Sequence, residues 1–202
     1  MIGKRLFDLV SSSLGLIVVS PLLSIIAIWI KIDSPGPIIF QQTRVGKGGK
    51  EFKIYKFRTM FVNAETLGKS ITVGNDFRIT KAGKLLRKYK LDELPQLVNV
   101  FKGEMSLVGP RPEVPRYVAF YTSEQRQVLK IRPGITDLAS IRFRNESEIL
   151  AQSEDPEAFY INNIIPQKIA LNQQYIQRAS LATDLIIIWQ TIAALFKNDL
   201  LP

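Results

Sequence analysis

The chain has 202 residues, of which 46% are hydrophobic and 22% charged, which excludes a disordered polypeptide and allows one domain with a core. Its net charge of +9 favours an anionic partner but leaves open nucleic acid, an acidic membrane or a phosphorylated substrate. The absence of Cys and His excludes disulfides, thiol nucleophiles, thiolate metal sites and the commonest general base. Catalysis would then rest on carboxylates, Lys, Tyr or hydroxyls, and a metal would be an oxygen-bound ion such as Mg²⁺.

The first predicted element is an uncharged segment from Leu9 to Ile30. As a helix that rises ~1.5 Å per residue, it is long enough to cross the ~30 Å hydrocarbon layer of a membrane. A cleaved signal peptide and a buried core helix are the alternatives, although no A-x-A-like cleavage site follows the segment. Basic residues flank both ends, which favours both ends on the cytoplasmic side. They are Lys4, Arg5, Lys31, Arg44, Lys47 and Lys50.

Ser20 and Pro21 lie in the middle of this segment. Pro removes a backbone donor and clashes with the preceding turn, so the helix is expected to kink or break there. The Ser20 hydroxyl is expected to satisfy a carbonyl that is freed in this way. The sequence therefore predicts a re-entrant membrane helix-break-helix over residues 1–33, with a straight but kinked span as the alternative. Residues 34–202 are predicted to form a second domain on the cytoplasmic face.

Together with the first segment, the elements expected further along the chain predict an α+β fold that is mainly helical with a small β-hairpin. Residues 38–40 and 52–57 are expected to form the hairpin strands around the Gly-rich turn 46–50, whose spacing fits no phosphate-binding loop. The helix expected near the C-terminus has a broad apolar surface, typical of a core helix or of a helix in the membrane interface. We expect a loop or short helices over 61–80, helices over 81–90, 94–102, 118–130, 155–177 and 182–197, and a loop over 103–116.

The adjacent acids Asp92 and Glu93, in the sequence LDELPQL, are the strongest local signal for chemistry. Pro95 favours the first turn of a helix, so both carboxylates are expected at a helix N-terminus, where the helix dipole stabilises carboxylates and phosphates. One carboxylate can attack while the other holds a metal ion or a proton. The alternative is that Asp92 is only an N-cap.

Several basic residues are candidates for binding phosphate. Arg111 lies in the rigid turn Gly109–Pro112, sequence GPRP, and Arg can bind a phosphate through two parallel hydrogen bonds. Arg87 precedes Asp92 by five residues and could face the same pocket. Lys56 and Arg58 lie where the chain leaves the predicted hairpin. An ordinary turn, a solvated cation and strand-edge charges are the respective alternatives.

Seven motifs occur in order and together resemble the bacterial sugar transferase family, the small monotopic phosphoglycosyl transferases. The resemblance covers nearly the whole chain. The motifs are Lys4-Arg5-x-x-Asp8, Ser20-Pro21, Tyr55–Met60, Leu91–Leu97, Gly103–Ser106, Gly109–Pro112 and Arg132–Thr136.

The resemblance implies a re-entrant membrane helix, Mg²⁺ and a two-step reaction at the cytoplasmic face of the bacterial inner membrane. Asp92 would attack the sugar-linked phosphate of a UDP-sugar, UMP would leave, and a polyprenyl (undecaprenyl) phosphate would then accept the phospho-sugar. Glu93 would be the Mg²⁺ ligand, and Asp184 is suggested as an anionic partner for Lys4 and Arg5. Phosphate or nucleotide binding is expected from Arg87, Arg111, Lys56, Arg58, Arg132, Thr136, Arg144 and Asn145.

The segment that follows Thr136 departs from the family pattern. Asp137, Ser140 and Phe143 do not match it, whereas Arg144 and Asn145 keep their places. This departure puts the nucleotide and sugar contacts in question more than the chemistry.

Two functions of other classes remain as alternatives: a membrane-tethered nucleic-acid-binding protein and a non-catalytic membrane scaffold. The positive charge is compatible with the first, but the sequence has no recognisable nucleic-acid-binding module, so no nucleic-acid partner is expected. Salt-dependent retention on DNA or RNA would distinguish it.

Overall fold

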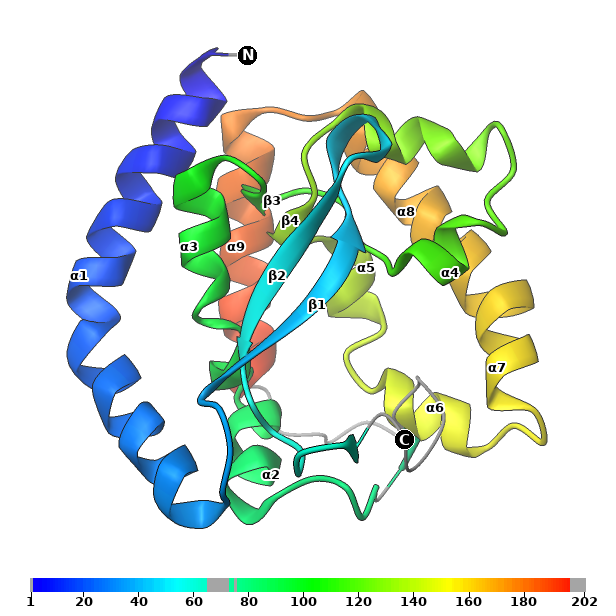
Figure 1. Cartoon of the computed structure of the whole chain (residues 1–202). Coiled ribbons are helices and arrows are strands. Elements are labelled where there is room, and N and C mark those ends of the chain that lie inside the picture. Colours follow the sequence, from blue (N-terminus) through cyan, green and yellow to red (C-terminus); the bar gives the residue numbers. More distant parts are fainter. Residues whose placement is uncertain (1, 65–72, 75, 197–202) are drawn as a thin grey trace.

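The computed structural model describes residues 2–64, 73–74 and 76–196. The helices are α1 (Ile2–Asp33), α2 (Lys81–Lys88), α3 (Gln96–Lys102), α4 (Pro115–Val118), α5 (Leu138–Arg142), α6 (Glu146–Ala151), α7 (Pro156–Phe159), α8 (Ile165–Gln177) and α9 (Leu181–Phe196). The strands are β1 (Ile39–Val45), β2 (Glu51–Phe57), β3 (Ser106–Val108) and β4 (Gly134–Thr136). Helix α1 lies along one side of a mainly helical domain (Figure 1). The predicted α+β class is confirmed.

Helix α1 leaves most of its apolar surface uncovered. Its N-terminal half packs on α3 and β3, and Ile26 and Ile30 near its C-terminal end pack on Phe57 and Leu86. By length and composition it could cross a membrane, yet only 11% of its most apolar 18-residue stretch is buried. A core helix would be mostly buried, so the core-helix alternative for this segment is wrong. The exposed apolar side chains are Ile2, Leu6, Leu9, Val10, Leu14, Ile17, Val18, Leu22, Ile25, Ile28, Trp29 and Ile32.

The predicted break at Pro21 is not found, because α1 continues through Pro21 without interruption. Pro21 lacks the N–H that would bond the carbonyl of Ile17, and the Ser20 hydroxyl donates to that carbonyl instead, at 2.8 Å. The expected role of Ser20 is therefore confirmed, and it explains why the helix tolerates the proline. Figure 1 shows the axis of α1 bending near its middle, with both ends directed toward the rest of the chain.

The predicted hairpin is confirmed as the antiparallel pair β1–β2, in which Ile39 opposes Phe57 and Val45 opposes Glu51. The chain reverses through Gly48 (φ 70°) and Gly49 (φ 78°), a left-handed conformation that glycine adopts without steric cost. The hairpin presents Ile54 to a cluster with Val100 and Met105.

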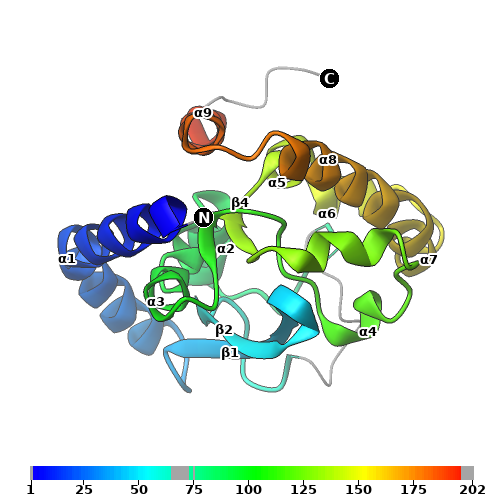
Figure 2. The ribbon, with the colours of Figure 1, turned by 90° about the horizontal axis from the view of Figure 1, so that it is seen from above.

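A second, two-stranded sheet was not predicted. Strands β3 and β4 are parallel and only three residues long, and β3 lies within the segment 103–116 that was expected to be loop. Strand β3 leads into Gly109 of the GPRP turn, and β4 begins at Gly134. A Cβ on Gly134 would lie 2.1 Å from the backbone nitrogen of Gly109. Only glycine permits this approach, which brings the GPRP turn against the Arg132–Thr136 motif. Seen from above, this pair lies between the hairpin and helices α8 and α9 (Figure 2).

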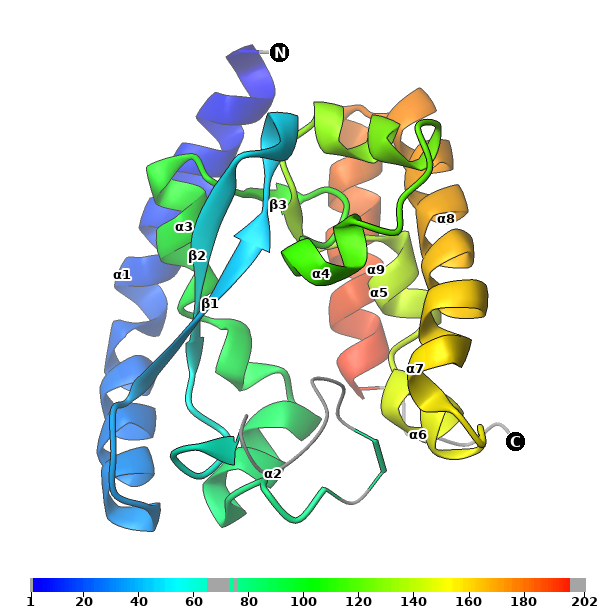
Figure 3. The same ribbon diagram turned by 45° about the vertical axis from the view of Figure 1, so that its right-hand side comes forward.

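The remaining helix predictions are mostly confirmed. The predicted helix over 118–130 is wrong: α4 ends at Val118 and a separate 3₁₀ helix covers Gln125–Lys130, so that Tyr117 and Val128 both reach the core around Ile165 and Ile169. The helix expected over 155–177 is present as α7, a π-helical turn and α8, stacked along one edge (Figure 3). Residues 65–72 and 75 of the expected loop 61–80, and residue 197 of the last helix, lie outside the described residues.

Candidate active site

Asp92 and Glu93 lie on a short 3₁₀ turn, Leu91–Glu93, directly before α3. Lys90 begins this turn in a left-handed conformation (φ 55°), and Pro95 is the N-cap residue of α3. Asp92 therefore caps neither element, and the alternative that it is only an N-cap is wrong. Both acidic side chains are buried, with 7% and 8% of their surfaces exposed. Two adjacent buried acids need compensating charge.

Two basic residues supply that charge to Glu93. Lys56 on β2 donates to its Oε1 at 3.0 Å, and Arg111 donates through Nη1 to its Oε2 at 2.9 Å. The second guanidinium nitrogen, Nη2, also donates to Oε1, so the Arg111–Glu93 pair is bidentate. Burial alone would raise the pKa of the Glu93 carboxyl, but Arg111 and Lys56 hold that pKa well below its usual range. Glu93 is therefore ionised.

Asp92 has a different environment. Its Oδ1 atom is buried and accepts no hydrogen bond from any described residue. Burial raises the pKa of the Asp92 carboxyl, opposed by the positive charge of Lys56 and reinforced by the negative charge of Glu93. The two adjacent carboxylates thus differ: one is clamped, and the other has a free oxygen and weaker charge stabilisation. Opposed pKa shifts in neighbouring acids are typical of sites that divide catalytic roles.

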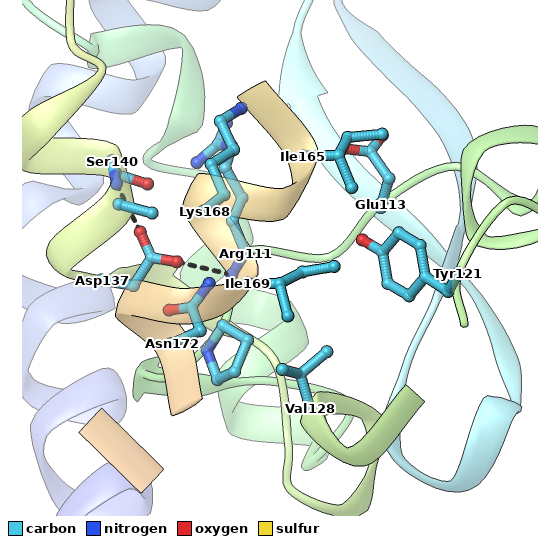
Figure 4. Close-up of a pocket in the computed structure, with 12 residues that line it drawn as sticks. Arg111, Glu113, Tyr121, Val128, Asp137, Ser140, Ile165, Lys168, Ile169 and Asn172 are labelled. Carbon is cyan, nitrogen blue, oxygen red and sulfur yellow. Dashed lines mark hydrogen bonds between the residues drawn. The ribbon is translucent and has the colours of Figure 1, made fainter. Parts of the chain in front are cut away.

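Arg87 and Arg111 complete the basic surroundings. Arg87 on α2 donates from Nε to Thr59 Oγ1 at 2.8 Å and lies close enough to Asp92 for each charge to affect the pKa of the other group. Asp137 accepts the backbone N–H of Arg111 at 3.0 Å, a bond drawn dashed in Figure 4. The structure thus brings together Asp92, Glu93, Lys56, Arg87 and Arg111, as the sequence predicted.

Comparison with known proteins decides the family. The bacterial sugar transferase family matches residues 1–198. The chain belongs to the bacterial sugar transferase family.

Individual members of the family are about two-fifths identical to this chain in sequence. The chain is 38% identical over 200 residues to the Aeromonas hydrophila UDP-N-acetylgalactosamine-undecaprenyl-phosphate N-acetylgalactosaminephosphotransferase, covering 96% of this chain and 44% of that protein. It is 38% identical to the UDP-glucose:undecaprenyl-phosphate glucose-1-phosphate transferase of Caulobacter vibrioides, covering 97% and 70%. It is 39% identical to the exopolysaccharide production protein PSS of Rhizobium leguminosarum bv. phaseoli, covering 96% and 95%. The chain thus spans less than half of the first relative.

The other residues that were predicted to bind phosphate lie elsewhere in this chain. Arg58 donates to the carbonyls of Ser34 (2.8 Å) and Pro35 (2.5 Å), just after α1 ends. Arg132 donates to Gly103 O (2.9 Å) after α3, and Arg144 donates to Ala194 O (2.6 Å) near the end of α9. These guanidinium groups bond backbone carbonyls at or just beyond helix ends. Thr136 is buried against Thr191, and Asn145 precedes α6 without capping it.

Asp184 was predicted to pair with Lys4 and Arg5, and the structure confirms the pair with Lys4. Tyr175 also donates to Asp184, at 2.6 Å. Arg5 instead donates to the carbonyls of Val100 and Phe101 at the end of α3. Lys4 and Arg5 thus connect the first turns of α1 to α9 and α3.

The sequence offered little to identify three further residues near the site. Asp137 was noted only as a departure from the family pattern, yet both of its oxygens accept backbone N–H groups, from Arg111 and from Ser140. Glu113, next to the GPRP turn, accepts from Arg44 and from Tyr160. Asn172, on α8, is far in sequence from Asp92, Glu93 and Arg111. Asp is a preferred N-cap residue, and Asp137 is the N-cap of α5, so an N-cap signal could have identified it.

Proposed function

We propose that the chain transfers a phospho-sugar from a UDP-sugar to polyprenyl (undecaprenyl) phosphate and releases UMP. The main observation that supports this proposal is that Asp92 Oδ1 is buried and accepts no hydrogen bond from any described residue. Beside it, Arg111 and Lys56 both donate hydrogen bonds to Glu93. Two relatives are named for transfer from UDP-sugars to undecaprenyl phosphate, and a third for exopolysaccharide production, which supports a role in polysaccharide biosynthesis. The comparisons give no support to the nucleic-acid-binding or scaffold alternatives.

The proposed reaction has two displacements at one phosphorus atom. The Asp92 carboxylate attacks the sugar-linked phosphorus, and the bond from that phosphorus to the bridging oxygen breaks, so UMP leaves with the bridging oxygen. A phosphate oxygen of the lipid then attacks the same phosphorus, and the bond to Asp92 breaks. Arg87 and Lys56 stand where they would offset the phosphate charge, which is the main requirement of phosphoryl transfer.

The residues at the site fit the Mg²⁺ that the family resemblance implies. No group of three acids lies together in the described part of the chain, but Mg²⁺ usually takes one or two carboxylates and completes its shell with water and substrate phosphates. Glu93 would be the carboxylate ligand, and Asp92 beside it would stay free to attack. When bound, the ion would neutralise charge on the diphosphate.

The function is tested by measuring UMP release over a panel of UDP-sugars with undecaprenyl phosphate present. The proposal expects release with at least one donor and formation of a lipid-linked phospho-sugar. No release with any donor, in the presence of Mg²⁺, would contradict it.

The raised pKa of Asp92 predicts the pH dependence of the first step. A protonated carboxyl cannot attack, so the rate should fall as the pH decreases through that pKa, and the fall should occur above the ordinary value of ~3.9. The Lys56→Met variant should shift the fall to higher pH, because the charge of Lys56 lowers this pKa. UMP release without lipid acceptor, measured from about pH 3 to 8, excludes titration of the lipid phosphate. A fall at or below the ordinary aspartate value would argue against Asp92.

The bidentate contact between Arg111 and Glu93 predicts a specific effect of Arg111→Lys. This change keeps the positive charge but loses the two parallel hydrogen bonds to the carboxylate. By the strength of charge-assisted pairs, the loss in transition-state stabilisation is expected to be ~2–3 kcal/mol, or roughly 30- to 150-fold in kcat/KM. Arg116→Lys is the matched control, since Arg116 is mostly exposed in a surface pair with Glu157. Equal kinetics of the two variants would show that the two parallel hydrogen bonds have no role in the reaction.

We propose that α1 re-enters the cytoplasmic leaflet instead of crossing the membrane, with residues 34–202 as the catalytic domain on that face. Both ends of α1 are fixed to the same domain, by Lys4 to Asp184 and by Arg58 to the carbonyls after α1. A perpendicular span would carry these polar contacts into the hydrocarbon, which is unfavourable. The outward apolar faces of α1 and of α9, where Leu185, Ile186 and Trp189 are exposed, would contact lipid.

This topology predicts that the start of α1 and the hairpin turn that follows β1 are both accessible from the cytoplasm. Because the chain has no native Cys, Ile2→Cys and Lys47→Cys can be labelled without background, and both positions are exposed. In membrane vesicles of known orientation, both should react with an impermeant thiol reagent only from the cytoplasmic side. Labelling of position 2 from the opposite side would show that α1 is a spanning helix.

A further inference from the structure

A small cavity adjoins the candidate active site on the side of Asp137. It has a volume of about 30 Å³ and lies between the GPRP turn, α5 and α8 (Figure 4). A water molecule needs ~10–15 Å³ of such space, so the cavity holds about two water-sized groups. Its wall is apolar at Val128, Ile165 and Ile169 and polar at Ser140, Asn172 and Lys168.

The polar part of the wall is incompletely bonded. Ser140 Oγ and Asn172 Oδ1 are buried atoms that have no hydrogen-bond partner among the described residues. Buried polar atoms in native proteins are nearly always bonded to protein groups, water or ligands, so two such atoms lining one cavity indicate that polar groups occupy it. They come from different helices, α5 and α8, and the same cavity contains them both.

Arg111 connects this cavity to the acids. Its backbone N–H donates to Asp137, and its guanidinium group donates to Glu93. Arg111 therefore lines the cavity and also holds the carboxylate of Glu93, next to Asp92. In Figure 4 Asp137, Ser140 and Asn172 lie on one side of Arg111, and Glu113 and Tyr121 lie on the other. One residue, Arg111, thus contacts both the cavity and the carboxylate next to Asp92.

We infer that the cavity receives one hydroxyl or hydroxymethyl group of the donor sugar, and that Ser140 and Asn172 help to select the sugar. This inference rests on the proposed function. The sugar is the favoured occupant because the relatives named above use donors that share uridine diphosphate but differ in the sugar, glucose in one and N-acetylgalactosamine in another. Two water-sized groups match the two non-hydrogen atoms of a hydroxymethyl group and not the four of an acetamido group.

The test compares Ser140→Ala and Asn172→Ala with the unaltered protein on UDP-glucose, UDP-galactose, UDP-xylose and UDP-N-acetylglucosamine. Gln174→Ala, an exposed position on α8, is the matched control. Each of the two variants should lower kcat/KM for the preferred donor by roughly three- to tenfold, the effect of one lost hydrogen bond. The ratio between donors should change, whereas inhibition by UMP should not. UDP-xylose lacks the hydroxymethyl group and should be affected least if that group fills the cavity.

Several outcomes would overturn the inference. They are unchanged kinetics in both variants, an equal loss for all donors, and a matching loss of UMP inhibition, which would place uridine in the cavity. Turnover by the unaltered protein separates these outcomes from failure of the proposed function, since absence of all turnover would overturn both. Asn172→Asp keeps the Oδ1 atom and should retain donor preference, which provides a second reading if Asn172→Ala does not fold.

Discussion

Asp92→Asn is expected to abolish UMP release. The amide has the shape of the carboxylate but lacks the charge that makes it a nucleophile, and the described structure offers no other acid with a free buried oxygen beside Glu93. Loss of a covalent nucleophile should reduce kcat by at least about 10³-fold, equivalent to ~4 kcal/mol in the barrier. UMP release in the presence of the preferred UDP-sugar measures this directly.

The covalent intermediate gives a second readout. With a UDP-sugar and no lipid acceptor, the intact mass of the unaltered protein should increase by one phospho-sugar, and peptide mapping should locate it on Asp92. Asp92→Asn should show no increase. Asp155→Asn is the matched control, because Asp155 is an exposed N-cap and Asn caps equally well. An adduct on another residue, or robust turnover by Asp92→Asn, would contradict the assignment.

Stability distinguishes lost chemistry from lost structure in this variant. Because folding raises the pKa of Asp92, ionisation of this group destabilises the folded state, and the effect is present above the folded pKa and absent below the unfolded one. Asp92→Asn removes that charge, so the variant should be at least as stable as the unaltered protein at neutral pH. An inactive variant with a lower unfolding temperature would not support the proposed role.

The elements that the sequence predicted correctly are those with strong local signals. The long apolar run, the Gly-rich turn and the apolar periodicity of α2, α3 and α9 each follow from neighbouring residues. Strands β3 and β4 have three residues each, too short for a periodic pattern, and 25 residues of very different structure separate them in the chain. Their pairing depends on contact between Gly109 and Gly134, which no local pattern expresses.

The same limit applies to the candidate site. Asp92, Glu93 and Arg111 were identified from local signals, an acid pair before Pro95 and a proline-flanked arginine, and from a family resemblance, and the structure joins Arg111 to Glu93. Arg58, Arg132 and Arg144 carry the same charge, but each bonds carbonyls at or near the end of a helix. A sequence shows that an arginine is present and does not show whether a phosphate or a helix end receives its hydrogen bonds. Only the position of the chain in space separates these roles.

Lys4→Met is expected to destabilise the folded protein by about 3 kcal/mol. The side chain of Asp184 is only 1% exposed and pairs with Lys4, whose own side chain is 17% exposed. Removing one partner of a buried pair leaves an uncompensated charge, which typically costs ~3–5 kcal/mol. The lower end applies here, because Tyr175 still donates to Asp184. Denaturant unfolding in detergent measures the change, and Lys31→Met, at the exposed opposite end of α1, should have little effect.

The double variant Lys4→Met with Asp184→Leu tests whether the charge itself causes the loss. Replacing both partners by apolar groups leaves no buried charge, so the double variant should be more stable than Lys4→Met alone. Tyr175 can still donate to the carbonyl of Val108, at 3.3 Å, so its hydroxyl keeps a partner. Because the pair joins α1 to α9, a double variant that is stable but no longer binds membranes would show that the pair also sets the position of α1. A double variant less stable than Lys4→Met would instead show that Asp184 stabilises α9 without help from Lys4, for example as an acid in the first turn of that helix.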